Sequence, residues 1–166
     1  MRMSTATYKS LLPWEDRWAE PTINQLFEPL IPQHRKAVEG LCLKIQDLEL
    51  VEKSLVWYGS GWYWTIQYDL NEPSGNLIEP PFCYVVPDNN SPRVCVPLTD
   101  KVFERLPVRR LNKFVRNATR SAKRGFDIYW FSVQLSASTE AEQLMDLIKR
   151  KYRYRTEAFE ASKSKK

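Results

Sequence analysis

The sequence has a single histidine, His34, and only three cysteines, Cys42, Cys83 and Cys95, with no CxxC pair among them. A structural zinc site needs four Cys or His ligands in close pairs, so that class of site is excluded. P-loop, GxGxxG, GxSxG and HExxH motifs are also missing. The sequence therefore identifies no catalytic residue, no metal site and no cofactor. We interpret His34, which stands among charged residues at an expected helix start, as an exposed residue without a catalytic role.

No apolar run approaches the roughly 18 residues that a membrane-spanning helix needs. The N-terminus also lacks the apolar stretch of about 7–15 residues that a secretory signal requires, because Leu11-Leu12 is followed at once by Pro13. We therefore expect a cytoplasmic protein without a membrane partner. In a reducing compartment the three cysteines are expected to be unpaired and buried as small apolar residues.

The chain has 166 residues, of which 43% are hydrophobic and 27% charged, close to the average of soluble domains. Six Trp, eight Tyr and seven Phe supply enough apolar area for a sizeable core. This length suits one domain and excludes a multidomain enzyme. We divide the chain into an irregular N-terminal arm over 1–20 with Trp14 and Trp18 as anchors, a single domain over 21–154, and a basic flexible tail over 155–166.

Hydrophobic spacing predicts the element order α-α-β-β-β-β-α-β-α. Strands are expected over 55–58, 62–69, 82–86, 93–98 and 127–135. Helices are expected over 22–30, 32–48, 107–123 and from 139, with Thr22 as an N-cap and with Thr139 and Glu142 in capping-box spacing. Short turns between strands favour a single α+β domain with a mainly antiparallel sheet of about five strands and helices packed on one face.

Large aromatic residues crowd one predicted hairpin, around Gly59-Ser60-Gly61. Both faces of this hairpin carry rings, from Trp57, Tyr58, Trp62 and Trp64. One interpretation is a core on one face and helix cover on the other, since aromatic residues are favoured in strands. The other is a partly open aromatic cleft that stacks a flat or apolar ligand. The sequence leaves both open.

Charge is divided unevenly along the chain. Residues 1–100 hold 8 Lys/Arg against 13 Asp/Glu, a net charge of −5, whereas residues 101–166 hold 17 against 7, a net charge of +10. In the predicted helix over 107–123, cations recur at steps of four and three, which places them on one stripe: Arg109, Lys113, Arg116, Arg120 and Lys123. The stripe is either a solvated helix face or a site for phosphate or another polyanion.

Three segments together resemble the small uncharacterised bacterial domains of the YdhG-like and related DUF families. They are Pro13–Thr22, the hairpin Val56–Ile66, and Gly125–Leu135 before the last helix. The resemblance covers roughly 13–152 and implies a helical lead, an aromatic hairpin, a curved antiparallel sheet and a closing helix. Some such relatives are discussed as frataxin-like iron chaperones, a role that needs an acidic surface, from which the basic stripe departs. No catalytic residue is implied for this chain.

These observations favour a non-enzymatic binding module that uses a basic helix to hold an anionic partner, either nucleic acid or another polyanion. The alternatives are a small-molecule binder or enzyme that uses the aromatic hairpin cleft, and a protein-interaction domain. The three differ in what they require: binding that weakens with salt, a concave aromatic pocket, or an exposed apolar patch.

Overall fold

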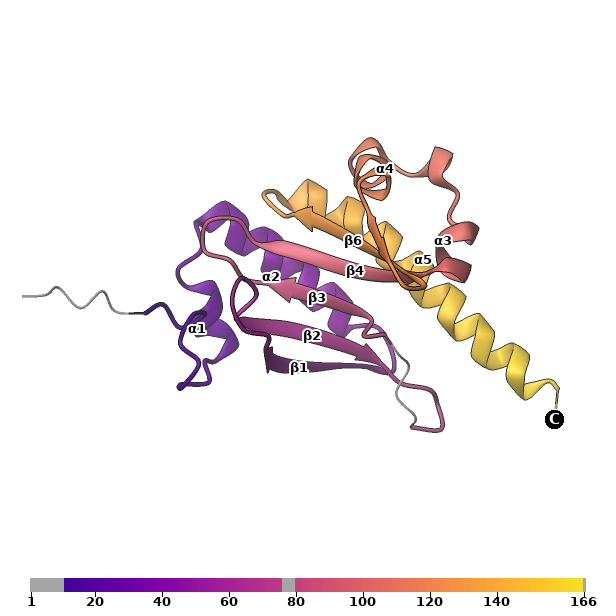
Figure 1. Cartoon of the computed structure of the whole chain (residues 1–166), viewed down its shortest axis with the longest axis horizontal. Helices are drawn as coiled ribbons and strands as arrows, with labels where there is room; N and C mark the ends of the chain where they lie inside the picture. Colours follow the sequence, from indigo (N-terminus) through magenta and orange to yellow (C-terminus); the bar gives the residue numbers. More distant parts are fainter. Residues whose placement is uncertain (1–10, 76–79, 166) are drawn as a thin grey trace, which may run out of the picture.

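In the computed structural model, which describes residues 11–75 and 80–165, an antiparallel sheet carries two long helices on one face (Figure 1). The strands are β1 (Val51–Trp57), β2 (Trp64–Leu70), β3 (Cys83–Val86), β4 (Arg93–Thr99), β5 (Lys123–Gly125) and β6 (Ile128–Gln134). The helices are α1 (Ile23–Phe27), α2 (Pro32–Gln46), α3 (Asp100–Arg105), the 3-10 helix η1 (Val108–Arg110), α4 (Lys113–Arg120) and α5 (Ser138–Lys163). The predicted single α+β domain is confirmed, although the sheet has six strands instead of five.

The strand order is β1-β2-β3-β4-β6-β5. Hairpins connect β1 to β4 in sequence, after which the chain leaves the sheet through α3, η1 and α4. It returns as β5 and β6, so that β6 pairs with β4 and β5 forms the outer edge. The strand that the sequence pattern missed is β5, which has three residues and is too short to show an alternating pattern. The helix predicted over 107–123 included Lys123, which is the first residue of β5.

Alternation along the strands divides the sheet into a helix-facing side and a front side, and the front side is turned toward the viewer in Figure 1. Paired residues on the helix-facing side are apolar and buried, such as Ile66, Val85 and Val94. α2 packs against this layer with the apolar positions that its spacing predicted, Val38, Leu41 and Ile45. Each large side chain buried here contributes about 1.5–3 kcal/mol, so this layer is the main source of stability.

Local capping residues set the helix starts. Thr22 and Gln25 form the capping box that opens α1, as the sequence predicted for Thr22. The predicted box at the start of α5 is wrong, because Glu140 is the residue whose carboxylate reaches the free amides. Its Oε2 accepts hydrogen bonds from the backbone N–H groups of Ser136 and Ala137, at 2.8 and 3.3 Å.

The last helix is longer than the sequence pattern indicated. α5 continues to Lys163, through residues that were expected to form a flexible tail. No glycine or proline follows Tyr154 to stop the helix. The end of α5 extends beyond the sheet in Figure 1.

The described part of the N-terminal arm is held by one tryptophan instead of two. Trp14 is 5% exposed, and its Nε1–H donates to the carbonyl oxygen of Trp62 at 3.0 Å. The backbone N–H of Trp64 donates to the Trp14 carbonyl at 3.2 Å, which ties the arm to the β1–β2 hairpin. Trp18 is 87% exposed and is therefore not an anchor.

A buried lysine replaces missing sheet hydrogen bonds. Lys151 of α5 is 1% exposed, and its Nζ donates to the carbonyl oxygens of Phe82, at 2.7 Å, and Pro97. The β3–β4 register ends at Tyr84↔Cys95, and two residues further along Pro97 has no N–H to donate to Phe82. The amine supplies the donors that proline lacks. Burial lowers the pKa of Lys151 to about 7.

The cysteines follow the prediction. All three are free and buried. Cys83 lies on the helix-facing side and Cys95 pairs with Tyr84 on the front side, so the two thiols occupy opposite faces of the sheet. Burial raises the pKa of Cys42 and of Cys95 to about 11.

Candidate functional site

The basic segment over 107–123 is not one helix, which corrects the sequence prediction. It consists of η1, α4 and the first residue of β5. Asn112 restarts the helix, because its side-chain oxygen accepts the N–H of Val115 at 2.9 Å and so caps a new N-terminus. Arg109 therefore lies on η1, whereas Lys123 lies on β5.

α4 itself is amphipathic in the way that the spacing predicted. Val115, Ala118 and Thr119 are buried against the body of the protein. Lys113 and Arg120 are exposed on the opposite side, and Arg116 is half-buried between them. The three central cations of the predicted stripe therefore share one face of a short helix.

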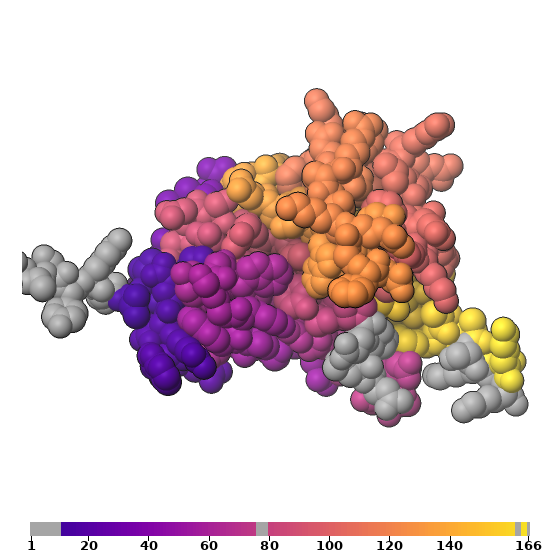
Figure 2. All heavy atoms as spheres, viewed as in Figure 1, coloured from indigo at the N-terminus to yellow at the C-terminus, as the bar shows by residue number. Residues whose placement is uncertain are grey.

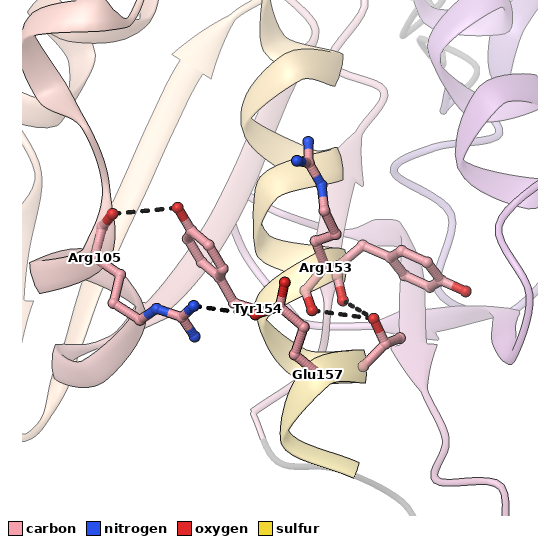
Figure 3. A network of polar contacts seen from close by, with 6 residues as sticks. Arg105, Arg153, Tyr154 and Glu157 are labelled. Carbon is pink, nitrogen blue, oxygen red and sulfur yellow. Dashed lines mark hydrogen bonds and ion pairs between the residues drawn. The ribbon is translucent and has the colours of Figure 1, made fainter. Parts of the chain in front are cut away.

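Two neighbouring arginines are neutralised. Arg105 of α3 pairs with Glu157 of α5 at 3.0 Å and stacks over the Tyr154 ring, whose hydroxyl donates to the Arg105 carbonyl (Figure 3). Arg124 of β5 makes two hydrogen bonds to the Asp100 carboxylate, at 2.7 and 3.2 Å. This arginine lowers the pKa of Asp100. Neither arginine is available to a partner without the loss of these contacts.

Six other cations of this region form no ion pair with any described residue. We call them the basic surface: Arg109, Arg110, Lys113, Arg116, Arg120 and Lys123. Arg110 was not part of the predicted stripe, because it falls outside the helical spacing. The segment that carries α4 and the β5–β6 hairpin projects from the body of the molecule, as the orange atoms in Figure 2 show.

Two aromatic residues of the β5–β6 hairpin adjoin the basic surface. Phe126 occupies the first position of a two-residue turn, with a φ of 55° and a 98% exposed side chain. Trp130 pairs across the strands with Lys123, so the ring and the cation lie on the same face. Trp130 is 36% exposed. The sequence analysis did not identify either ring as a site residue. The only indication in the sequence was the Gly-Phe-Asp turn between the basic segment and the alternating pattern of the next strand.

The four rings predicted to form a ligand cleft lie in two groups. Trp57 and Trp64 pack edge to face at 5.6 Å, next to Tyr63. Tyr58 and Trp62 instead lie at 5.8 Å from each other, and both contact Tyr84 of β3. None of the cavities described here has one of the four predicted rings on its lining. The aromatic cleft stays a prediction.

An aromatic row crosses the front side of the sheet. Tyr84 lies at its centre, 5.7 Å from Tyr58, 5.3 Å from Trp62 and 6.5 Å from Trp130 between ring centroids. The row connects the β1–β2 hairpin with the β5–β6 hairpin. Burial raises the pKa of Tyr84 and also that of Tyr58, so both phenols are neutral at physiological pH.

The two ends of this aromatic row differ in charge. At the β1–β2 end the Tyr58 hydroxyl bonds to Gln67, whose amide in turn donates to Asp69 at 2.9 and 3.0 Å. Glu52 pairs across the strands with Asp69 and adds a second carboxylate. At the β5–β6 end the ring of Trp130 has Lys123 as its cross-strand neighbour. The first end also holds a cation, because the Arg93 side chain of β4 donates to the Gly61 carbonyl oxygen at 2.7 Å. The first end therefore has mixed charge with more carboxylates than cations, whereas the second has a cation beside its ring.

The described residues include few side chains arranged for catalysis or for metal binding. Among them, no group of three or more His, Cys, Asp or Glu side chains is placed to hold a metal ion. His34 lies in the first turn of α2, as predicted, but it is half-buried instead of exposed. A cavity of about 670 Å³ lies beside the start of α3 and has carboxylates and cations on its wall, from Asp100, Asp127, Lys101 and Arg155. Its mixed charge does not favour an anion.

Comparison with protein-family models, with curated proteins and with solved structures found no match. Within 11–75 and 80–165, no helix combines the length and the apolar character needed to cross a membrane.

Proposed function

We propose that this protein is a non-enzymatic binding module and that its basic surface holds a polyanionic partner. The observation that supports this most is that six cations, gathered on η1, α4 and β5, have no carboxylate partner among the described residues. The neighbouring cations Arg105 and Arg124 are paired. Carboxylate partners are thus present in this region, but among the described residues none of them pairs with the six cations of the basic surface.

The fold tolerates these charges without requiring them. Like charges three or four residues apart on a helix repel by only a few tenths of a kcal/mol per pair. A chain of phosphates would remove this repulsion and would release the counterions condensed on the polyanion. Such binding depends on charge and not on a sequence of bases, because nothing here marks a base-reading element.

The test is fluorescence anisotropy with labelled oligonucleotides over a salt series. Wild-type protein is expected to bind at low salt, with log affinity falling against log salt by about 0.7 to 0.9 per phosphate contact. The variant Lys113→Glu/Arg116→Glu/Arg120→Glu is expected to lose binding and to keep its melting temperature within a few degrees, since these side chains project from α4.

The matched control reverses three exposed cations elsewhere, Arg17→Glu/Lys36→Glu/Lys53→Glu. The two triple variants have the same net charge, so a difference between them reports the position of the cations. Equal loss in both would mean that only net charge matters and would overturn the assignment to α4. If wild-type protein fails to bind any polyanion at low salt, the basic surface is a solvated face.

A further inference from the structure

We propose that the partner of the basic surface is single-stranded nucleic acid, with unpaired bases stacked on Phe126 and Trp130. This inference rests on the proposed function, since the cations would hold the phosphates. It adds the chemical class of the partner. Polyphosphates and acidic proteins have no flat bases to stack on the two rings, and a duplex keeps its base faces inside the helix. Single-strand binding surfaces combine cations with aromatic rings in this way.

Phe126 has no role in the fold that accounts for it. Its side chain is 98% exposed and so contributes almost no apolar burial. Its φ of 55° belongs to the left-handed region, which costs a residue with a Cβ about 1–2 kcal/mol and which glycine occupies freely. A large apolar side chain at a strained and exposed turn position is better explained by contact with a ligand.

Trp130 brings a second ring to the same hairpin. Its cross-strand partner is Lys123, which places a cation beside the ring. By the rise of a strand, about 3.3 Å per residue, the backbone at Trp130 lies roughly 10 Å from the turn. Stacked bases repeat at about 3.4 Å, so the two rings suit a run of about three nucleotides.

Charges around the hairpin limit the path of the strand. Arg120 and Lys123 supply cations on the α4 side, whereas Asp127 is exposed at the turn next to Phe126. Toward the other end of the aromatic row, the two carboxylates of Asp69 and Glu52 outnumber the single cation of Arg93 and disfavour phosphates. The expected footprint is therefore short and covers α4 and β5–β6, without reaching β1.

The experiment measures the binding of three probes: a short oligothymidylate, a duplex of the same length and inorganic polyphosphate. Each probe is tested on wild type and on four variants. The variants are Phe126→Gly, Trp130→Ala, the conservative Trp130→Phe, and Trp18→Ala as an exposed ring outside the site. Oligonucleotides are followed by anisotropy and polyphosphate by calorimetry. Because Trp130 contacts Tyr84, its alanine variant is checked by thermal unfolding, and Phe126→Gly provides a test that does not disturb packing.

Loss of a stacked base is expected to weaken oligothymidylate binding roughly 5- to 150-fold in Phe126→Gly and in Trp130→Ala. Trp130→Phe should regain most of the affinity, Trp18→Ala should bind as wild type, and polyphosphate affinity should stay within about twofold throughout, since the phosphates meet only cations. If Phe126→Gly and Trp130→Ala bind oligothymidylate as tightly as wild type, or if wild type prefers the duplex or polyphosphate, the inference is wrong while the proposed function stands. If none of the probes binds wild type, the proposed function itself has failed.

Discussion

The β1–β2 and β5–β6 hairpins both carry large aromatic residues, yet they use them differently. In the first, Trp57, Trp64 and Tyr63 pack on one another, and Trp14 of the arm joins them at 4.8 Å from Tyr63. In the second, the Phe126 side chain is 98% exposed at the turn. A positive φ occurs in both hairpins, at Tyr63 and at Phe126, but only the Tyr63 ring is packed against other rings among the described residues. The number of aromatic residues in the sequence made the first hairpin a candidate site. The second hairpin is a candidate because it exposes a large ring that does not contribute to the core.

Cations show the same contrast. Lys151 is buried and its two carbonyl partners account for its presence. The cations of α4 are outside the core and have no ion-pair partner among the described residues. Replacing a side chain whose partners lie within the fold should change stability. Replacing a side chain without such partners should change binding and leave stability nearly the same. The predictions below test this division.

The largest effect is expected where the N-terminal arm packs on the β1–β2 hairpin. Trp14→Ala should lower the free energy of unfolding by about 3–5 kcal/mol, because it empties a buried site and breaks the hydrogen bond to the Trp62 carbonyl. Trp18→Ala, which removes an exposed ring from the same arm, should change it by less than about 0.5 kcal/mol. Denaturant titration of both variants measures this. Similar values for the two would mean that the arm is not held as described.

Lys151 should make stability depend on pH. Its pKa is about 7 in the folded protein against an ordinary 10.5, so between these values the unfolded chain binds more protons. The free energy of unfolding should therefore rise from pH 7 to 9, by at most about 2–3 kcal/mol. Besides burial, the charges that act on the amine are those of Cys83, on the same side of the sheet, of Arg155, and of Cys95 on the other side. The buried thiols act on stability in the opposite direction above about pH 9.

The measurement is urea unfolding at several pH values of wild type and of Lys151→Met, with Lys149→Met as an exposed control on the same helix. Lys151→Met should lose the rise with pH, and Lys149→Met should keep it. A Lys151→Met curve parallel to wild type would show that the buried amine does not titrate in this range.

A smaller effect is expected from release of a paired arginine. Asp100→Asn removes the carboxylate that accepts both hydrogen bonds of Arg124 and leaves it only the exposed Asp127 at 4.0 Å. Arg124 then becomes more available to an anionic partner. Oligonucleotide binding should become tighter at low salt, with a salt slope steeper by about 0.7 to 0.9. Glu20→Gln in the N-terminal arm makes the same change in charge away from the site. An equal gain in both variants would exclude a local effect of Arg124.

The smallest expected change is in the stability of Phe126→Gly. Glycine relieves the positive φ at no cost in packing, so the free energy of unfolding should stay the same or rise by up to about 1 kcal/mol. Thermal unfolding beside wild type is sufficient to measure it. A clear loss of stability would mean that the ring has a structural role, which would remove the main argument for a ligand contact.

Much of the fold could be predicted because its signals are local. The alternation in β2 and β6, the apolar spacing in α2 and the cap at Thr22 are set by neighbouring residues, and the structure has all of them. The break at Asn112 could not be seen, since the cations keep a helical spacing across it. β5 has only three residues, and its place is set by pairing with β6.

The candidate site was only half predictable, for a related reason. Regular spacing revealed Lys113, Arg116 and Arg120 as one face of a helix. Nothing in the sequence tells which ring of a strand lies on a face without helix cover, because this depends on how α2 and α5 pack. Phe126 and Trp130 became candidates only when their exposure and their position beside Lys123 were known.

The central claim is that the β5–β6 hairpin and α4 form the binding surface, while the aromatic β1–β2 hairpin does not. The most direct measurement is a titration of isotope-labelled protein with oligothymidylate at low salt, followed by amide chemical shifts along the chain. We expect perturbations concentrated between Lys113 and Trp130, with the segment Trp57–Trp64 unaffected. Perturbations confined to Trp57–Trp64, or none at any concentration, would contradict it.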